Sequence, residues 1–320
     1  VCFALALLCL PVGQAMAGFG VDRFGALRIL LAGISCFVLA GLGLAMATSS
    51  SALYAVAALA GLGNTVFHPA DFTVLNRHVS PPRLGHAFSV HGLSGNLGWA
   101  AAPLFLTGLA TLVGWRVAAA STIFVAIAAM LLLWHNRALL DTGHHAHAAK
   151  QSGHGTFDFM RVGAVWLCFA FFFLITAAFG AIQNFATPIL QNLYQLPLGL
   201  AATALSTYLL AGAGGILVGG FVAQKQANDR IIAVVLGLAA LLALLLAANV
   251  VPGWAVLPLM AGIGFFSGIA GPSRDLLVRR AATARFGQAA YGRIYGFVYS
   301  GLDAGLAAAP LVFGGYMDRG

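Results

Sequence analysis

The stretch GLGNTVFHPADFTVLNRHVSPPRLGHAFSVHGLSGNLGWAAAPLFLTG, residues 61–108, places polar side chains inside sequence that is otherwise apolar enough for a lipid bilayer. It predicts two antiparallel membrane helices joined by a short basic turn. Asn64, His68 and Asp71 recur at i, i+4 and i+7, which predicts that they share one face of the first helix, beside Pro69. Because ionisable side chains are costly at membrane depth, this face is a candidate functional site.

The composition excludes a soluble globular domain. Hydrophobic residues make up 61% of the chain and charged residues 8%, and glutamate is absent, whereas about a quarter of the residues of a soluble domain are charged. The net charge of +8 comes from basic residues in turns between apolar runs, which indicates membrane topology and no binding of nucleic acid. The cysteines lie within apolar runs and form no CxxC pair, so they predict neither a metal site nor a disulfide.

Apolar runs of membrane-spanning length predict an all-α membrane protein with ten transmembrane helices. The predicted spans are residues 1–17, 27–48, 52–76, 84–112, 115–135, 162–190, 198–223, 231–250, 253–280 and 288–316. A signal peptide is the alternative for residues 1–17, but that run has no basic leading end and enters a charged turn that recurs later.

Lysine and arginine alternate between the two sets of turns. The turns after the odd-numbered spans hold Arg23, Arg28, Arg77, Arg83, Arg137, Lys150, Arg161, Lys225, Arg230, Arg279, Arg280 and Arg285. The opposite turns ATSSSA, QNLYQLPLG and NVVPGW hold none. This bias predicts a multi-pass protein of the cell's inner membrane whose basic turns are cytoplasmic.

The longest connection, residues 136–161, divides the spans into two sets of five. It carries a histidine-rich tract formed by His144, His145, His147 and His154. The tract is either a metal-binding segment or a solvated linker, and we favour the linker because no cysteine accompanies the histidines. The predicted domains are an N-terminal bundle over residues 1–135, this cytoplasmic linker, and a C-terminal bundle over residues 162–320.

The two halves repeat. GFGVDRFGALRIL from Gly18 aligns with GFVAQKQANDRII from Gly220, and GNLGWAAAPLFLTG from Gly95 aligns with LDAGLAAAPLVFGG from Leu302. The second match pairs Asn96 with Asp303. Both matches keep a separation of roughly two hundred residues, which indicates an internal duplication into two pseudo-symmetric bundles.

The first of these repeats resembles the Gly-x-x-x-Asp-Arg/Lys-x-Gly-x-x-Arg/Lys signature of the major facilitator superfamily. Its residues here are Gly18, Asp22, Arg23, Gly25 and Arg28. The runs His-Pro-Ala-Asp, residues 68–71, and Ser-Val-His-Gly-Leu-Ser-Gly-Asn-Leu-Gly, residues 89–98, resemble the branch that contains the fosmidomycin-resistance efflux proteins.

The resemblance implies a family pattern of twelve helices, of which the first and last are expected to be missing from a fragment. It also implies export by antiport, with two departures. The arginine that drug antiporters carry in the fourth helix is replaced by Ala57, and the closing glycines of the antiporter pattern are Leu106 and Thr107.

The resemblance further implies site residues. In the family the third, sixth and ninth spans of this chain would line the central cavity, so Asn64, Gln183 and Asn184 are expected to contact the substrate. Arg274 in the ninth span, as the anchor for an anion, and Asp303 in the tenth span, near the midplane, are the other candidate substrate residues. The alternative for the amides is interhelical packing. Asp22 is expected to act as a cytoplasmic latch with Arg77 as its partner.

The rise of ~1.5 Å per helical residue places His68, Asp71 and His91 at similar depths, and they are the predicted proton-coupling residues. We expect Asp71 to alternate between a proton and an interaction with Arg274, since burial favours the protonated carboxyl group and a nearby cation favours the ionised one. The alternative is a static charge pair that closes the inner gate.

These observations favour a proton-driven secondary transporter that exports a small polar or amphipathic compound or drug. Uptake of a small organic anion, anchored by Arg274, is the second hypothesis. A membrane-embedded enzyme or sensor is the third, and it lacks motifs such as HExxH, GxSxG or a phosphate-binding loop. The expected partners are substrate, protons and lipid, with no cofactor, no metal and no nucleic acid, and we expect a monomer.

Overall fold

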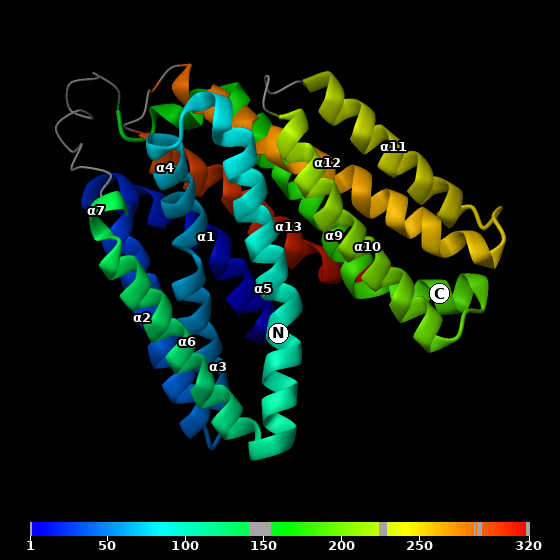
Figure 1. The fold of residues 1–320 in the computed structure, drawn as a ribbon, viewed down its shortest axis with the longest axis horizontal. Helices are drawn as coiled ribbons and strands as arrows, with labels where there is room; N and C mark the ends of the chain where they lie inside the picture. The colour runs from blue at the N-terminus through cyan, green and yellow to red at the C-terminus, as the bar shows by residue number, and fades with distance from the viewer. Residues whose placement is uncertain (1, 141–154, 224–228, 285, 287–289, 318–320) are drawn as a thin grey trace. The chain divides into compact units, whose positions relative to one another are not determined.

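The computed structural model describes residues 2–140, 155–223, 229–284, 286 and 290–317, with side chains except at residues 2–9, 99, 100, 103 and 104. The described residues are helical almost throughout and contain no β-strand (Figure 1). The elements are α1 Cys2–Phe24, α2 Ala26–Met46, α3 Ser50–Asn64, α4 Phe67–His78, η1 Pro81–Arg83, α5 Leu84–Val113, α6 Trp115–His135, α7 Arg137–Leu140, η2 Asp158–Arg161, α9 Gly163–Tyr194, α10 Leu198–Val222, α11 Asp229–Ala247, η3 Gly253–Ala255, α12 Val256–Thr283 and α13 Tyr291–Met317.

Each predicted span coincides with one of these helices, or with two consecutive ones, to within a few residues. Among the described residues, eight helical spans are long and apolar enough to cross a membrane, and α1 and α5 occupy the other two predicted spans. The all-α membrane class predicted from the sequence is therefore confirmed.

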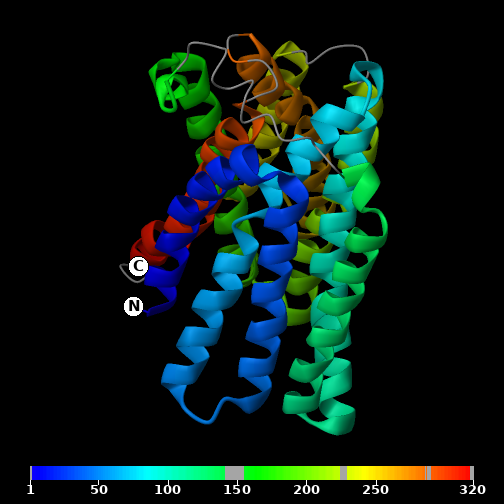
Figure 2. The same ribbon diagram turned by 90° about the vertical axis from the view of Figure 1, so that its left-hand side faces the viewer.

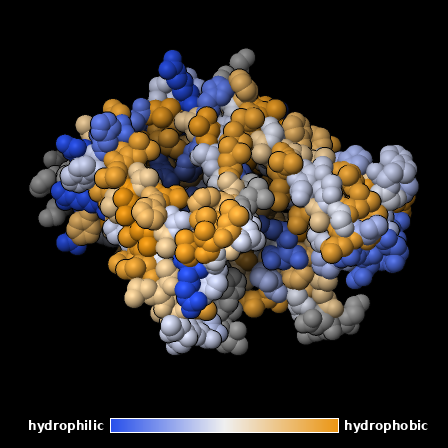
Figure 3. All heavy atoms as spheres, turned by 60° about the horizontal axis from the view of Figure 1, so that its bottom comes forward, coloured by the Kyte–Doolittle hydropathy of each residue, from blue (hydrophilic) through white to orange (hydrophobic). Residues whose placement is uncertain are grey.

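The outward-facing surfaces of the helices are apolar. Large side chains such as Leu112, Phe124 and Leu167 are mostly exposed, and Figure 3 shows apolar residues over much of the face that it draws. A protein surrounded by water rarely exposes so much contiguous apolar surface. These surfaces suit contact with lipid chains.

Thr65 and Val66 interrupt the span predicted over residues 52–76 and divide it into α3 and α4. Pro69 explains the interruption, because a proline ring collides with the carbonyl group four residues earlier, here that of Thr65, and its nitrogen cannot donate a hydrogen bond. The backbone N–H of Thr65 donates to the carbonyl of Leu62 over 3.3 Å, which tightens the last turn of α3.

This interruption corrects the predicted polar face. Asn64 is the last residue of α3 and is exposed, whereas His68 and Asp71 lie in α4 and are half-buried. The three side chains therefore do not share one face of a continuous helix. The prediction was wrong because helical spacing alone ignores the effect of Pro69 on the preceding turn.

The turn after the first span is shorter than predicted, since α1 continues through residues 18–24. Gly25 alone separates α1 from α2, with a φ of 86°. A residue with a β-carbon is strained at such a φ, so the sharp reversal depends on glycine at this position.

The chain divides into two compact units. Unit 1 contains residues 1–78, 99–177 and 278–308, and unit 2 contains residues 79–98, 178–277 and 309–320. Each unit takes segments from both halves of the sequence. The predicted division into residues 1–135 and 162–320 is not tested by these units, and it stays a prediction.

In each unit, a helix from one half of the sequence packs closely on a helix from the other half. In unit 1 the backbone of α1 at Gly18 meets that of α13 at Gly292, and Figure 2 shows α1 in blue running beside α13 in red. In unit 2 the backbone of α10 at Gly220 meets α5 at Gly85 and Ser89.

The two contacts are related by the internal duplication. The sequence repeat pairs Gly18 with Gly220, and the register that pairs Asn96 with Asp303 also pairs Gly85 with Gly292. The same close approach therefore occurs once in each unit. It supports the two pseudo-symmetric bundles inferred from the repeat.

Small residues also bring α10 against α12 in unit 2. The backbone at Gly215 meets that of Phe265, and the backbone at Gly219 meets that of Ile269. Such spacing lets helices in a bilayer associate through van der Waals contact, which replaces the hydrophobic effect as the driving force there. Buried side chains of α9, α10 and α12, among them Leu190, Tyr208 and Met260, complete this core.

Replacing Gly18 with alanine tests the α1–α13 contact. The new methyl group would lie against the carbonyl oxygen of Gly292. We therefore expect overpacking to lower the free energy of unfolding by about 1–3 kcal/mol. Thermal unfolding of the detergent-solubilised complete protein measures this loss of stability.

Gly95→Ala is the matched control, because a β-carbon on Gly95 meets nothing within 4 Å and alanine favours helix. Equal melting temperatures for the two variants would contradict the assigned contact.

Candidate functional site

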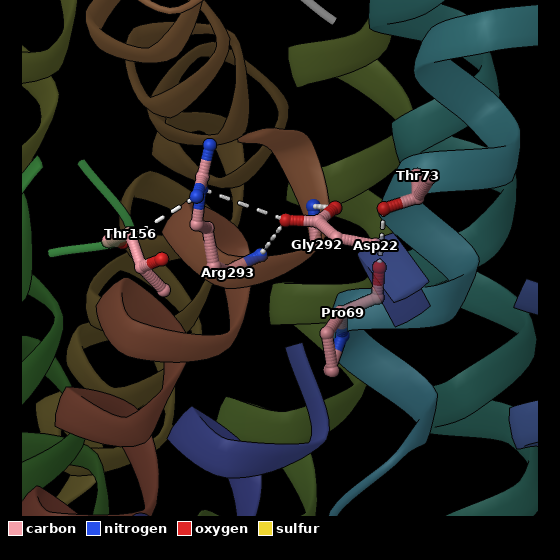
Figure 4. A network of polar contacts seen from close by, with 6 residues as sticks. All are labelled: Asp22, Pro69, Thr73, Thr156, Gly292 and Arg293. Carbon is pink, nitrogen blue, oxygen red and sulfur yellow. Dashed lines mark hydrogen bonds and ion pairs between the residues drawn. The ribbon is translucent and has the colours of Figure 1, made fainter. Parts of the chain in front are cut away.

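The carboxylate of Asp22, in the last turn of α1, makes several polar contacts with α13. It accepts hydrogen bonds from the backbone N–H groups of Gly292 over 2.9 Å and Arg293 over 3.2 Å (Figure 4). These are the second and third residues of α13, whose first N–H groups have no partner within their own helix. Asp22 thus caps α13 from another helix and places a negative charge at its positive end.

The Arg293 side chain adds a charged contact to this cap. Its Nε lies 3.7 Å from Oδ2 of Asp22, and both side chains are largely buried. Its Nη1 donates to the carbonyl of Thr156 over 3.4 Å, just before η2. Figure 4 shows Arg293 between Thr156 and Asp22. One arginine therefore joins α13, the end of α1 and the segment before α9.

Aromatic side chains fix the segment before α9 against the same two helices. The ring centroid of Phe19 in α1 lies 5.4 Å from that of Phe157 and 6.1 Å from that of Phe159. The Phe159 ring also packs against Phe297 of α13, at 5.7 Å. The end of the predicted linker is thus an ordered part of unit 1.

Helix α4 faces the same end of α13. Arg77 interacts electrostatically with Asp22 and with Tyr291, and the Asn76 amide donates to the hydroxyl of Tyr295 over 3.0 Å. The nearby hydroxyl of Thr73 donates to the carbonyl of Pro69 over 2.6 Å, within α4 (Figure 4). α4 therefore contributes one cation and one amide to the polar groups around α13.

Nearer the N-terminus of α4, His68 lies in an aromatic cluster. Its ring centroid is 4.7 Å from that of Tyr299, which also packs against Phe72 at 4.7 Å and Phe172 at 4.6 Å. Asp71 is half-buried on the same helix. Two of the three predicted proton-coupling residues thus lie on α4 in unit 1, and His68 packs against Tyr299 of α13.

The third, His91, lies on α5 in unit 2, where it interacts electrostatically with Asp275. Asp275 also accepts a hydrogen bond of 3.1 Å from Nε of Arg274. His91 and Arg274 belong to one unit and Asp71 to the other. The joint site of His68, Asp71 and His91, and the exchange between Asp71 and Arg274, therefore stay predictions.

The predicted substrate residues differ in their surroundings. Asn64 and Asn184 are exposed, and the Asn184 amide donates to Gly180 of its own helix over 2.7 Å. Gln183 is half-buried. Asp303 is buried, with 8% of its surface exposed, and its Oδ2 has no hydrogen-bond partner among the described residues.

The residues of the predicted gate motif separate into two groups. Gly18, Asp22 and Arg77 gather around the first turn of α13. Arg23 and Arg28 are exposed, and the Arg23 guanidinium lies 5.2 Å from the ring of Phe24. Gly25, which makes the turn between α1 and α2, positions them.

Sequence reasoning missed Arg293 and three buried tyrosines, Tyr291, Tyr295 and Tyr299. The signal that could have found the tyrosines is their spacing of four residues, which places them on one helix face. Arg293 carried no such signal, because only the packing of α1 on α13 brings it beside Asp22.

The predicted histidine-rich tract at residues 144–154 lies outside the described residues. Within the part of the chain that the structure describes, no group of three or more potential metal ligands occurs. The site therefore consists of charged and hydrogen-bonding side chains that can hold helices together, bind polar compounds or exchange protons.

The chain is similar to known membrane transporters. It is 31% identical to the Multidrug resistance protein B homolog of Mycobacterium tuberculosis over 110 residues, 34% of this chain and 20% of that protein. It is 28% identical to the Fosmidomycin resistance protein of Escherichia coli over 228 residues, 68% of this chain and 54% of that protein. The chain thus spans about half the length of this second relative, and less of the first.

A solved structure has the same fold. The proton:xylose symporter XylE superposes with a TM-score of 0.75 over 99% of this chain and 78% of that chain, at 15% sequence identity. The family model of the Major Facilitator Superfamily matches residues 1–315. The helical architecture, the duplicated halves and this match together show that the chain belongs to the Major Facilitator Superfamily.

Proposed function

We propose that the protein is a secondary active transporter that exports a small polar or amphipathic compound in exchange for protons. The observation that carries this proposal is the capping of α13 by Asp22, because it joins two helices of the transport fold through contacts that can break and re-form. Membership of the family supports a transporter in preference to an enzyme.

The cap has the properties of a latch. Asp22 accepts two backbone hydrogen bonds and faces one arginine, all from the first turn of α13. Hydrogen bonds to charged groups contribute about 1.5–3 kcal/mol each, so together they can hold one conformation without making it permanent. When α1 separates from α13, water must solvate Asp22 and the freed N–H groups. We propose that this exchange accompanies each transport cycle.

We infer the direction of transport from the names of the relatives. Two of them are named for resistance to drugs, one of them to fosmidomycin, and resistance is the result expected when a compound is exported. Uptake of an organic anion has less support, since the Arg274 side chain that would anchor the anion is already bonded to Asp275. Fosmidomycin is the first compound to test.

The proton-coupling residues of this proposal are His68, Asp71 and His91, with Arg274 as the alternating partner of Asp71. Histidine and a buried carboxyl group can both change charge near neutral pH. The substrate would contact Asn64, Gln183, Asn184, Arg274 or Asp303. We place the protein in the inner membrane with the basic turns in the cytoplasm.

Replacing Asp22 tests the latch. Asp22→Ala removes the acceptor for two N–H groups and leaves Arg293 largely buried without its carboxylate. We expect the complete protein to lose about 3 kcal/mol of stability and most of its fosmidomycin export, measured as drug retained by cells.

Asp158→Ala is the control, because the ion pair of Asp158 with Arg161 is partly exposed and belongs to a class worth about 0–1 kcal/mol. Asp158 also accepts a hydrogen bond from the backbone N–H of Gly155, and neither contact involves α13. Export by Asp22→Ala equal to that of the control would remove the latch from the mechanism.

Collapse of the proton gradient tests the direction. If protons drive export, cells that produce the complete protein should retain more fosmidomycin after a protonophore is added. Uptake driven by protons predicts less retention, and that result would overturn export. Cells without the protein give the baseline.

A further inference from the structure

Four buried residues follow one face of α13. Tyr291, Tyr295, Tyr299 and Asp303 recur every four residues, which places them on one side of the helix. The three tyrosines are at most 1% exposed and Asp303 is 8% exposed. We call these four residues the tyrosine face.

The internal duplication indicates that packing at the first two tyrosine positions does not require a hydroxyl group. The register that pairs Asn96 with Asp303 pairs Tyr291 with Leu84 and Tyr295 with Phe88. Leu84 is fully buried and Phe88 is 2% exposed. Apolar side chains therefore fill the positions of α5 that match Tyr291 and Tyr295, whereas Tyr299 is paired with Gly92. The hydroxyl groups occur at these positions in the second half and not in the first.

Polar groups from α4 accompany the tyrosine face. Arg77 interacts electrostatically with Tyr291, the Asn76 amide donates to the Tyr295 hydroxyl, and the His68 ring packs on Tyr299. Tyrosine hydroxyl groups and imidazole nitrogens can each donate and accept a hydrogen bond. Hydroxyl or imidazole groups thus occur at each turn of α13 from Tyr291 to Tyr299, and the Tyr291 hydroxyl makes no hydrogen bond to a described residue.

Asp303 is the last of the four residues of the tyrosine face. Its Oδ2 is buried without a hydrogen bond, and no ion pair joins Asp303 to any side chain that the structure describes. A buried charge without a partner is costly, whereas a carboxyl group that binds a proton avoids that cost.

Three helices pack against α13 in unit 1, and two of them, α4 and α9, contact the tyrosine face at Tyr299. Their contacts are Gly18 of α1 with Gly292, His68 of α4 with Tyr299, and Phe169 of α9 with Gly301. The titratable and charged groups that these helices carry in unit 1, where their side chains are described, are Asp22 and Arg23 on α1, His68, Asp71, Arg77 and His78 on α4, and Cys168 on α9. Asp158 and Arg161 lie on η2, which packs against α13 through Phe159.

We propose that Asp303 is a proton-binding site and that its proton travels along the tyrosine face from the end of α13 that Asp22 caps. This inference rests on the proposed proton coupling and gives it a further carboxyl group. No bond to substrate is involved: the Asp303 carboxylate takes up a proton, and the adjoining hydroxyl and imidazole groups relay protons one at a time.

Infrared difference spectroscopy of the purified complete protein tests the site without a substrate. When the pH is lowered, a protonated carboxyl group gains a carbonyl stretching band, and we expect Asp303→Asn to lose one such band. Asp71→Asn is the matched variant on α4 and should keep that band. Loss of the same band in Asp71→Asn, or its persistence in Asp303→Asn, would overturn the assignment.

The rate of this titration after a pH jump tests the route. Tyr295→Phe and Tyr299→Phe keep the rings and remove the hydroxyl groups, so we expect both to slow the appearance of the Asp303 band. Tyr208→Phe is the control, because Tyr208 is a buried tyrosine of α10 in unit 2. Equal rates in the three variants would exclude the tyrosine face as the route.

Transport assays in proteoliposomes separate this inference from the proposed function. With fosmidomycin as the probe, Asp303→Asn should lose accumulation driven by a proton gradient and keep exchange of labelled for unlabelled drug. Loss of exchange with an unchanged infrared band would instead make Asp303 a substrate ligand. If the wild-type protein moves no fosmidomycin, the proposed substrate is wrong, while the infrared titration still decides the proton site.

Discussion

The capping of α13 by Asp22 is the interaction on which the arrangement of unit 1 depends. The first N–H groups of a helix need acceptors, and at the edge of a membrane protein water does not always supply them. Here Gly18 lets the backbones of α1 and α13 touch, and Asp22, one turn later, then reaches the N–H groups of Gly292 and Arg293. A larger residue at position 18 would hold the carboxylate away from α13.

The same contact organises the polar groups around it. Because α13 is fixed against α1, its tyrosine face lies against α4, where Asn76 and His68 meet Tyr295 and Tyr299. Unit 2 repeats the close approach of helices at Gly220, but the positions of α5 that match Tyr291 and Tyr295 are apolar. The duplication therefore supplied a common packing scheme, and the two halves then diverged in chemistry. Within the proposed transport cycle, the latch and the proton site would share one helix.

Much of this architecture could be predicted from the sequence. Apolar runs gave the spans, because the bilayer sets their length, and the signature at residues 18–28 identified the turn that holds the latch. The break before α4 was missed because spacing arguments treat a helix as regular, whereas Pro69 disturbs the turn before it. Arg293 was missed because its partner lies 271 residues away in sequence. Asp71 and Arg274 share no compact unit, so their predicted exchange depends on a geometry that sequence spacing does not supply.

The most direct test of the cap is hydrogen exchange at the first turn of α13, measured by mass spectrometry on the complete protein. The amides of Gly292 and Arg293 donate to Asp22, so these amides should exchange faster in Asp22→Ala than in wild type, measured in peptides that begin several residues before Gly292. Asp158→Ala, which alters a partly exposed ion pair that does not contact α13, should leave that exchange unchanged. Equal exchange in wild type and Asp22→Ala would contradict the account.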